Sequence, residues 1–454
     1  MLRIRQGRAG AGLLVLLALS SGCRPAYKAE PEADGGEARA VQAIKDLAGT
    51  VRRDEKQDGK PIVAVSLCFT KVTDAELNEL AALNQLRELD LSSTAVTDEG
   101  LKELAPLKQL RKLNLGRTKV MGGGLKELAA LSQLRKLTLA DTVVTDAGLK
   151  QLAALNQLQL LYVSGTAVTD VGLRELAPLR ELQKLDLSGT AVTDAGLTDL
   201  ASLKQLRELT LAETKVTDAG LRQLAPLKNL QHLHLGRTKV TDGGLKGLAA
   251  FSQLQELVLG ETEVTDVGLK ELAPLKHLQE ISLGGTKVTD GGLKELAALK
   301  QLQVLYLSNT AVTDAGLKDL AALNQLREIS LFGTKVTDKG LRQLAPLKQI
   351  QSLNLGRTAV TGAGLRELTP LKQLEKLVLL GTGVKDTDLK ELAALNQLRE
   401  LDLSRTAVTD EGLKELSALG QLHTLFLFEC KVTDAGVADL RNALPKLLIL
   451  HERH

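Results

Sequence analysis

The amino-acid sequence predicts a curved α/β solenoid that is built by stacking one short repeated unit. The first observation is a strict period of 24 residues, which carries the first leucine of the unit from Leu86 to Leu422 with Ile350 once in its place. With a degenerate copy at Ile62 this makes sixteen repeats without an insertion or deletion. The second observation is that each unit contains a segment of strand periodicity followed by one of helical periodicity. A fixed period of this length indicates a stack of repeats rather than a single globular core.

The strand part of each unit comes first. In Leu89-Asp90-Leu91 one polar residue separates two leucines, so both leucines point to the same side of a strand. A threonine, Thr94 in this unit, recurs at the bend that follows the strand. We expect its hydroxyl group to satisfy backbone groups of the bend in a buried ladder.

The helical part follows after a short turn. Thr97 and Asp98 precede it and are expected to cap the helix by accepting hydrogen bonds from its free N–H groups. The periodic glycine, Gly100 in this unit, is assigned to the turn and not to a nucleotide-binding loop. The apolar residues at helical spacing in this unit are Leu101, Leu104, Ala105 and Leu107.

Neither part can bury its leucines alone, so the repeats must stack. Stacking places the strands in one parallel sheet and the helices on the other face. Strands lie about 4.8 Å apart whereas helices need roughly 10 Å, so the stack must curve with its strands on the concave side.

The composition and the motifs exclude several classes of function. Apolar residues make up 44% and charged residues 25% of the 454 residues, which is typical of a folded protein. The formal net charge of +3 is small for this length and argues against a nucleic-acid binder. No Ser/His/Asp arrangement, glycine-rich phosphate loop or Cys-x-x-Cys cluster is present, so we expect no enzyme and no cofactor.

The segment L-x-x-L-x-L-x-x-T-x-V, which begins at Leu86, resembles the strand motif of the leucine-rich repeat family, with threonine in place of the more usual asparagine or cysteine. The following V-T-D-x-G-L-x-x-L-A is similar to the convex half of bacterial and F-box-type repeats. The resemblance covers residues 62 to about 436. It implies an arc whose concave sheet binds proteins, although a fold does not define one partner.

The N-terminus is predicted to be an export signal. Arg3, Arg5 and Arg8 precede an apolar stretch, residues 9–20, that is too short to span a bilayer. Residues 19–23 then resemble the lipobox of bacterial lipoproteins, with Ser20 where that family prefers an aliphatic residue. The resemblance implies cleavage before Cys23, lipid attachment to Cys23, and an exported protein anchored to a bacterial membrane on its periplasmic or cell-surface side. The alternative is an ordinary secretory signal with a chance cysteine.

The chain is thus divided into a signal peptide (1–22), a flexible tether (23–36), an N-terminal cap (37–61), the solenoid (62–436) and a C-terminal cap (437–454). The N-terminal cap is expected to contain an amphipathic helix and a polar stretch, and the C-terminal cap a truncated strand at 447–450, shifted by one residue. Cys68 and Cys430 lie in the first and last repeats and are expected to be buried free thiols. We expect a monomer.

Residues that face the concave side and differ among repeats are the candidates for binding. Exposed apolar side chains gather toward the C-terminal third, and aromatic anchors are typical of binding hot spots. Phe426 and Phe428 have an alternative role, which is to pack under the C-terminal cap. The predicted protein-binding residues are Tyr162, Val304, Tyr306, Phe332, Val378, Leu380, Phe426 and Phe428.

Two groups of ionisable residues on the same face are not counted among the predicted protein-binding residues. His232 and His234 project from one strand beside Glu208 and Glu256, but no third histidine is adjacent, so no metal site is predicted. Glu213, Arg237 and Glu261 occupy one register position on consecutive strands. We expect these three residues to form a lateral charge ladder of little energetic weight.

The prediction from sequence is therefore a non-enzymatic scaffold, lipid-anchored in the cell envelope, that binds a protein or surface polymer through its concave face. The first alternative is a structural spacer of the envelope. The second is a substrate-recognition subunit like the intracellular F-box proteins, against which the N-terminal signal segment argues.

Overall fold

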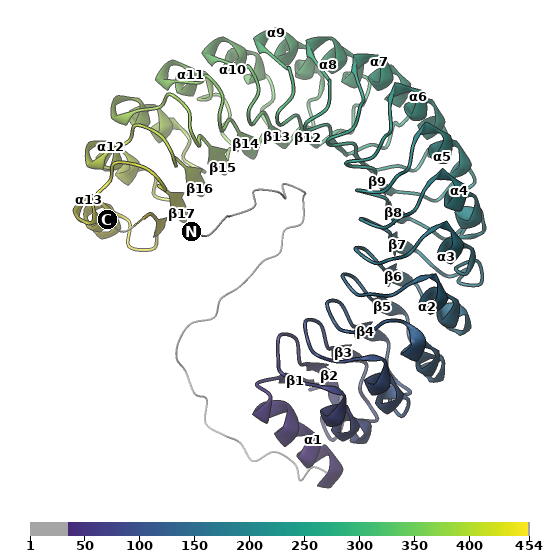
Figure 1. Cartoon of the computed structure of the whole chain (residues 1–454). Coiled ribbons are helices and arrows are strands. Elements are labelled where there is room, and N and C mark those ends of the chain that lie inside the picture. Colours follow the sequence, from purple (N-terminus) through teal and green to yellow (C-terminus); the bar gives the residue numbers. More distant parts are fainter. Residues whose placement is uncertain (1–34, 453–454) are drawn as a thin grey trace, which may run out of the picture.

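The computed structural model describes residues 35–452, which form one continuous arc (Figure 1). The predicted signal peptide, the predicted lipid-attachment residue Cys23 and nearly all of the predicted tether lie outside these residues. Along the arc every strand lies on the inner rim and the helices lie on the outer rim (Figure 1). The predicted curvature is confirmed, because helices need more room than strands.

One 18-stranded sheet runs the length of the arc, and each strand pairs with the strands before and after it in the chain. From β2 onward all pairs are parallel, and partners lie one repeat apart, as in Leu257 and Ile281. The strands are β1 (Thr50–Arg53), β2 (Ile62–Ser66), β3 (Glu88–Asp90), β4 (Lys112–Asn114), β5 (Lys136–Thr138), β6 (Leu160–Tyr162), β7 (Lys184–Asp186), β8 (Glu208–Thr210), β9 (His232–His234), β10 (Glu256–Val258), β11 (Glu280–Ser282), β12 (Val304–Tyr306), β13 (Glu328–Ser330), β14 (Ser352–Asn354), β15 (Lys376–Val378), β16 (Glu400–Asp402), β17 (Thr424–Phe426) and β18 (Leu448–Leu450).

The outer rim consists of short helices rather than long ones, because the repeat leaves few residues between its turns. The α-helices are α1 (Gly35–Asp46), α2 (Asp146–Lys150), α3 (Asp170–Arg174), α4 (Asp194–Leu197), α5 (Asp218–Gln223), α6 (Asp242–Leu245), α7 (Asp266–Leu269), α8 (Asp290–Leu296), α9 (Asp314–Leu317), α10 (Asp338–Leu344), α11 (Gly362–Glu367), α12 (Asp410–Glu415) and α13 (Asp434–Ala443). The 3-10 helices are η1 (Asp74–Ala82), η2 (Asp98–Leu104), η3 (Gly123–Ala130), η4 (Gln151–Ala154), η5 (Thr198–Ser202), η6 (Lys246–Ala250), η7 (Lys270–Leu272), η8 (Lys318–Ala322), η9 (Asp386–Ala394) and η10 (Leu416–Ala418).

The core is a column of leucines between the sheet and the helices. Leu305 in β12 and Leu317 in α9 are both 0% exposed, and their counterparts in other repeats are equally buried. The bend threonines form the expected ladder, since the Thr94 hydroxyl donates to the carbonyl of Leu91 at 2.6 Å and this bond recurs along the chain. Cys430 takes the place of this threonine in the last repeat and is buried as expected. Cys68 is only half-buried, contrary to the expectation, because it follows β2 on the concave side, where its Sγ atom lies 3.2 Å from Oγ of Ser66.

The aspartate that recurs at this position of most repeats does not cap its own helix, contrary to the expectation. Asp314, for example, accepts hydrogen bonds from the backbone N–H and the hydroxyl of Thr337, one repeat later, at 2.7 and 2.6 Å. The same pair of bonds links most neighbouring repeats. The threonine itself caps the helix, as expected, since Thr337 accepts from the N–H of Lys339. The aspartate is therefore a clasp between repeats.

The periodic glycine leaves room for the aspartate of this clasp and does not belong to the turn. Gly340 lies inside α10, and a Cβ atom there would lie 2.3 Å from Oδ1 of Asp314. The same close approach recurs between Gly196 and Asp170. The glycine is required because the carboxylate of the preceding repeat fills the space of a side chain.

The clasp changes wherever the preceding aspartate is missing. Residue 362 is glycine, and Asp388 of the next repeat fills its space and accepts from the N–H of Lys385 at 3.0 Å. In the first repeat, which has no repeat before it, Glu76 accepts hydrogen bonds from the N–H and the hydroxyl of Thr73. The hydrogen bonds that Thr73 donates to Glu76 lower the pKa of that carboxyl group.

The two ends are closed in different ways. Helix α1 begins at Gly35, before the expected boundary at 37, and a Cβ atom on Gly36 would lie 3.1 Å from Cβ of Ala82 in η1. The sequence does not predict β1, which pairs antiparallel with β2. At the other end, Ile449 pairs with Leu425, so β18 keeps the common register and is not shifted as expected. The register is kept because Ile449 is buried at the position where other repeats have the strand leucine. Leu447, two residues earlier, is also buried.

Among residues 35–452 no helix is both long enough and apolar enough to cross a membrane.

Candidate functional site: the concave face

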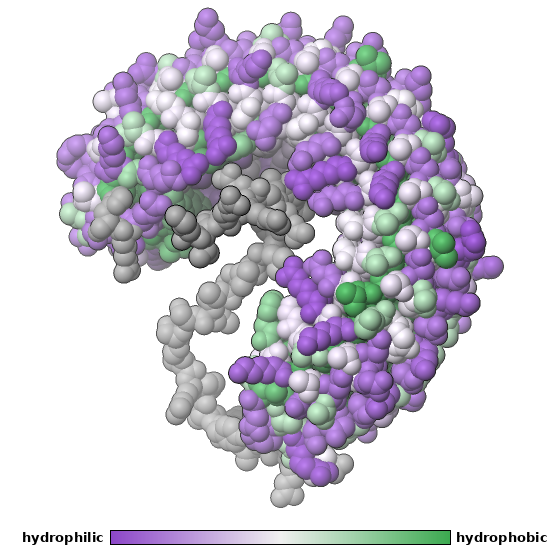
Figure 2. All heavy atoms as spheres, viewed as in Figure 1, coloured by the Kyte–Doolittle hydropathy of each residue, from purple (hydrophilic) through white to green (hydrophobic). Residues whose placement is uncertain are grey.

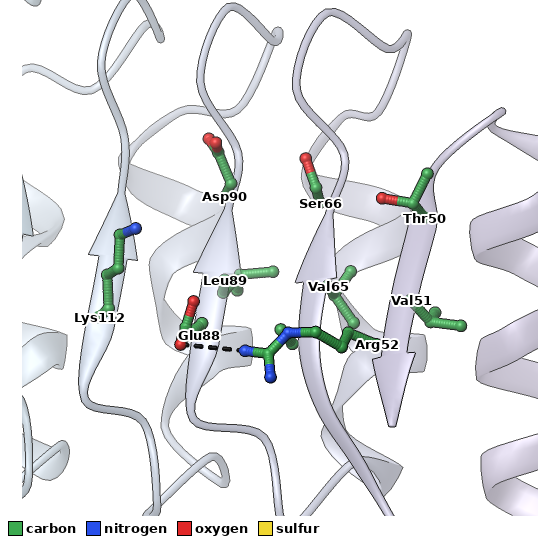
Figure 3. Close-up of a pocket in the computed structure, with 10 residues that line it drawn as sticks. Thr50, Val51, Arg52, Val65, Ser66, Glu88, Leu89, Asp90 and Lys112 are labelled. Carbon is green, nitrogen blue, oxygen red and sulfur yellow. Dashed lines mark hydrogen bonds and ion pairs between the residues drawn. The ribbon is translucent and has the colours of Figure 1, made fainter. Parts of the chain in front are cut away.

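The concave face is formed by the strand residues on either side of the buried leucine. Figure 3 shows Glu88 and Asp90 on the same face of β3, while Leu89 between them points away from it. At this N-terminal end β1 to β4 line a shallow depression that includes Arg52, Asp90 and Lys112. The guanidinium group of Arg52 lies 3.1 Å from the carboxylate of Glu88 (Figure 3). This ion pair covers part of the depression.

Charge is distributed unevenly along this face. The residue before the buried leucine is lysine in β4, β5 and β7. Toward the middle of the arc it becomes glutamate in β8, β10, β11 and β13, with His232 in β9. Hydrophilic residues cover most of the surface visible in Figure 2, and hydrophobic residues are scattered between them.

The two histidines of β9 bind one carboxylate. Nδ1 of His232 lies 2.9 Å from Oε2 of Glu256, and Nε2 of His234 lies 2.7 Å from Oε1. The hydrogen bonds from His232 and His234 lower the pKa of Glu256 to about 2 although burial opposes the shift. Burial lowers the pKa of His234, but its hydrogen bond to Glu256 and the nearby carboxylates outweigh burial and raise it. Within residues 35–452 no group of three or more His, Cys, Asp or Glu side chains is arranged to hold a metal ion.

This cluster predicts a stability contribution that depends on pH. A raised pKa of His234 contributes stability below the ordinary value of 6.5 and loses it as pH rises through the folded value. A lowered pKa of Glu256 contributes stability above 4.5, and this stability is lost progressively as pH falls from 4.5 to about 2. His234→Gln should therefore lower the free energy of unfolding by about 1 kcal/mol near pH 5.5 and by less near pH 8.5. Urea unfolding at both pH values measures this difference.

The matched control for that prediction is His277→Gln, which changes an exposed histidine outside the cluster. An equal loss at both pH values for His234→Gln would contradict the assignment.

The predicted apolar residues all reach the surface, but they do not form one continuous patch. Tyr306, in β12, donates its hydroxyl hydrogen to Glu328 at 3.0 Å, and burial together with that carboxylate raises its pKa. Asp402 separates Val378 from Phe426 on the adjacent strands. Tyr162 lies in β6, six strands from Tyr306, and is not part of the same region.

Phe426 and Phe428 remain at the surface beside the C-terminal cap. Phe426 is half-buried and pairs with Leu450 of β18, while Phe428 is 40% exposed. Their ring centroids lie 6.4 Å apart in a tilted arrangement. The last strand thus extends the concave face next to them.

The remaining predicted residues lie on the repeats around Phe332, with Ser352 and Asn354 of β14 between the repeats of Phe332 and Val378. We define the apolar region as Val304, Tyr306, Phe332, Val378 and Leu380, which come from β12, β13, β15 and the residues after them. The Phe332 ring lies against Gly356 of the next repeat, where a Cβ atom would be 2.8 Å from Cδ2 of the ring. The side chain of Arg357 lies over this ring, with its Cζ atom 5.4 Å from the centroid.

A second feature of the face is the residue that directly follows the position of Phe332 and Leu380 in each repeat. Its backbone is left-handed in every repeat. The eleven such positions that carry side chains include Arg117, Arg237, Arg357 and Arg405, and the rest are glycine. Arg237 is paired with Glu213 at 3.0 Å and with Glu261 at 2.9 Å, which confirms the charge ladder. Arg357 appears in the sequence only as one of four dispersed arginines. Its glycine neighbours one repeat away, Gly333 and Gly381, are the signal that sets it apart.

The comparisons with known proteins agree with this architecture. A model of the leucine-rich repeat region matches residues 183–451, and a leucine-rich repeat model matches residues 83–105. No curated protein matches the sequence.

Solved structures show the same fold at low identity. An internalin from Listeria monocytogenes is 22% identical, with a TM-score of 0.56 over 82% of this chain and 95% of that one. A leucine-rich repeat protein from Leptospira interrogans is 24% identical, with a TM-score of 0.57 over 82% and 91%. The functional domain of InlJ from Listeria monocytogenes is 17% identical, with a TM-score of 0.50 over 81% and 74%. With the repeat model matching more than half of its residues, the chain belongs to the leucine-rich repeat family.

Proposed function

We propose that this protein is a non-enzymatic scaffold that binds a protein partner through the apolar region of its concave face. The observation that supports the proposal most is the placement of Tyr306 and Phe332 on neighbouring repeats of an otherwise mainly polar sheet. Both side chains are half-buried, so part of each ring is already held by the scaffold. A partner that covers them gains apolar contact at a low cost in side-chain entropy.

Site-specific crosslinking tests this proposal. A photoreactive amino acid at Ser352 of β14, between Phe332 and Val378, should crosslink a partner in cells, whereas the same group at Lys318 of η8 on the outer rim should not. Tyr306→Ala combined with Phe332→Ala should lower the yield at Ser352 roughly tenfold or more, since each hot spot contributes about 2 kcal/mol.

Tyr162→Ala in β6 is the matched control, because it removes a half-buried tyrosine from the same face outside the apolar region. Equal yields from Ser352 and Lys318, or a yield unaffected by the double substitution, would contradict the site. A complete lack of specific adducts would favour a structural spacer.

The cellular location is a separate part of the proposal. We infer from the N-terminal sequence that the protein is exported and attached to a membrane through a lipid on Cys23. Labelled fatty acid should enter the full-length protein and should be absent from a Cys23→Ser variant. Labelling that persists in this variant would exclude Cys23 as the attachment residue.

A further inference from the structure

Arg357 differs from the other arginines that share its register position. Arg117 is paired with Asp141 at 3.0 Å, Arg237 with two glutamates, and Arg405 with Glu429. Arg357 has no ion pair among residues 35–452. The residues one repeat before and after it, Gly333 and Gly381, have no side chains to offer it.

The backbone conformation of Arg357 is energetically unfavourable, and no ion pair among the described residues offsets it. Its φ of 54° is left-handed, a conformation that is unfavourable for a residue with a side chain and costs glycine little. The paired arginines recover part of this cost through their ion pairs. Arg357 has only its contact with the Phe332 ring, and an exposed contact of this kind contributes little. A strained position that carries an unpaired charge points to a role outside the isolated chain.

The surroundings hold this guanidinium group in place without neutralising it. Phe332 lies under it, and Gly356 gives the ring room to lie flat against the next repeat. Leu380 lies after β15 in the next repeat, where its carbonyl accepts the N–H of Arg357 at 2.7 Å, and its half-buried side chain keeps that side of the region apolar. The positive charge therefore lies at the edge of an apolar surface and keeps donors free for an acceptor.

We propose that Phe332 and Arg357 together bind a partner segment in which the carboxylate of an aspartate or glutamate lies beside an apolar side chain. This inference rests on the proposed function and names the chemistry of its partner. The carboxylate accepts hydrogen bonds from the guanidinium group, and the apolar side chain packs on Phe332 and Leu380. Phosphate-rich polymers are a poorer fit, since they require several free cations, whereas Arg237, five repeats before Arg357, and Arg405, two repeats after it, are already paired.

A phage-displayed library of random dodecapeptides tests the inference on the full protein. Peptides selected on the wild type should be enriched in Asp or Glu next to an apolar residue. A selected peptide should bind Arg357→Gln roughly tenfold or more weakly, and its own Asp→Asn or Glu→Gln variant should lose a similar factor on the wild type. On Arg357→Gln the two forms of the peptide should bind alike.

Arg405→Gln is the matched control, because it removes an exposed arginine that has the same backbone conformation but is paired. It should leave the preference for a carboxylate unchanged. Phe332→Ala should weaken both forms of the peptide. Thermal unfolding of Arg357→Gln should stay close to the wild type, since no ion pair is lost and only the contact with the Phe332 ring is removed.

The outcomes separate this inference from the proposed function. If binding depends on Phe332 but shows no preference for a carboxylate, or keeps that preference in Arg357→Gln, the inference is wrong and the proposed binding region stands. If the wild type selects no peptide, or if the selected peptides bind equally after Phe332→Ala, both are wrong.

Discussion

Replacing Gly340 by alanine should destabilise the protein by about 2–4 kcal/mol, although the change adds a single methyl group. The new Cβ atom would lie 2.3 Å from Oδ1 of Asp314, whose Cα and Cγ atoms follow at 3.1 Å. The carboxylate must move, and it then loses both hydrogen bonds to Thr337. Equilibrium unfolding in guanidinium chloride measures the loss as a shift of the midpoint.

A double-mutant cycle tests whether Asp314 is the cause. Asp314→Ala alone should destabilise the protein by about 1–3 kcal/mol, because two charge-assisted bonds disappear. Gly340→Ala should then add little, since the three atoms nearest to its Cβ all belong to Asp314 and two of them are gone. Gly420→Ala is the control, because a Cβ atom there has no atom within 4 Å. Strictly additive losses would show that the glycine is needed for another reason.

Leu305→Ala, in the interior strand β12, should destabilise the protein by about 2–5 kcal/mol. Leu305 is 0% exposed and lies between Ile281 of β11 and Ile329 of β13. In a solenoid the stability is carried by contacts between neighbouring repeats, so a cavity here weakens two interfaces at once. Hydrogen exchange should show faster opening on both sides of β12.

Ile449→Ala in β18 is the matched substitution at the end of the sheet, where the strand pairs only with β17. We expect a smaller loss of stability and faster exchange confined to the last repeats. Equal losses at Leu305 and Ile449 would contradict the view that stability depends on neighbouring repeats.

The sequence predicted the solenoid, the curvature and the buried columns because each depends on a pattern within one repeat. Leu89 and Leu101 can be assigned to the interior from their spacing alone, and the structure buries both. The same logic explains the threonine ladder, since Thr94 bonds to a carbonyl three residues away.

The contacts that sequence reasoning missed join residues in different repeats. Asp98 was expected to cap its own helix, but it accepts from the N–H groups of Met121, Gly122 and Gly123. Residue 122 is glycine, so Thr145 receives no carboxylate from the preceding repeat, and no replacement acceptor is present among the described residues. That junction is the one where neither form of the clasp forms.

By itself the sequence determined the family, the register and the identity of the inner and outer faces, since periodicity expresses which side chains must leave water. Only the tertiary structure decided which side chains meet across repeats. Residues 23 or 24 apart come within hydrogen-bonding distance, so the role of Gly340 follows from Asp314. In the same way, the free charge of Arg357 follows from the glycines at 333 and 381 on either side of it. Such roles depend on the neighbouring copies, and reading one repeat at a time cannot reveal them.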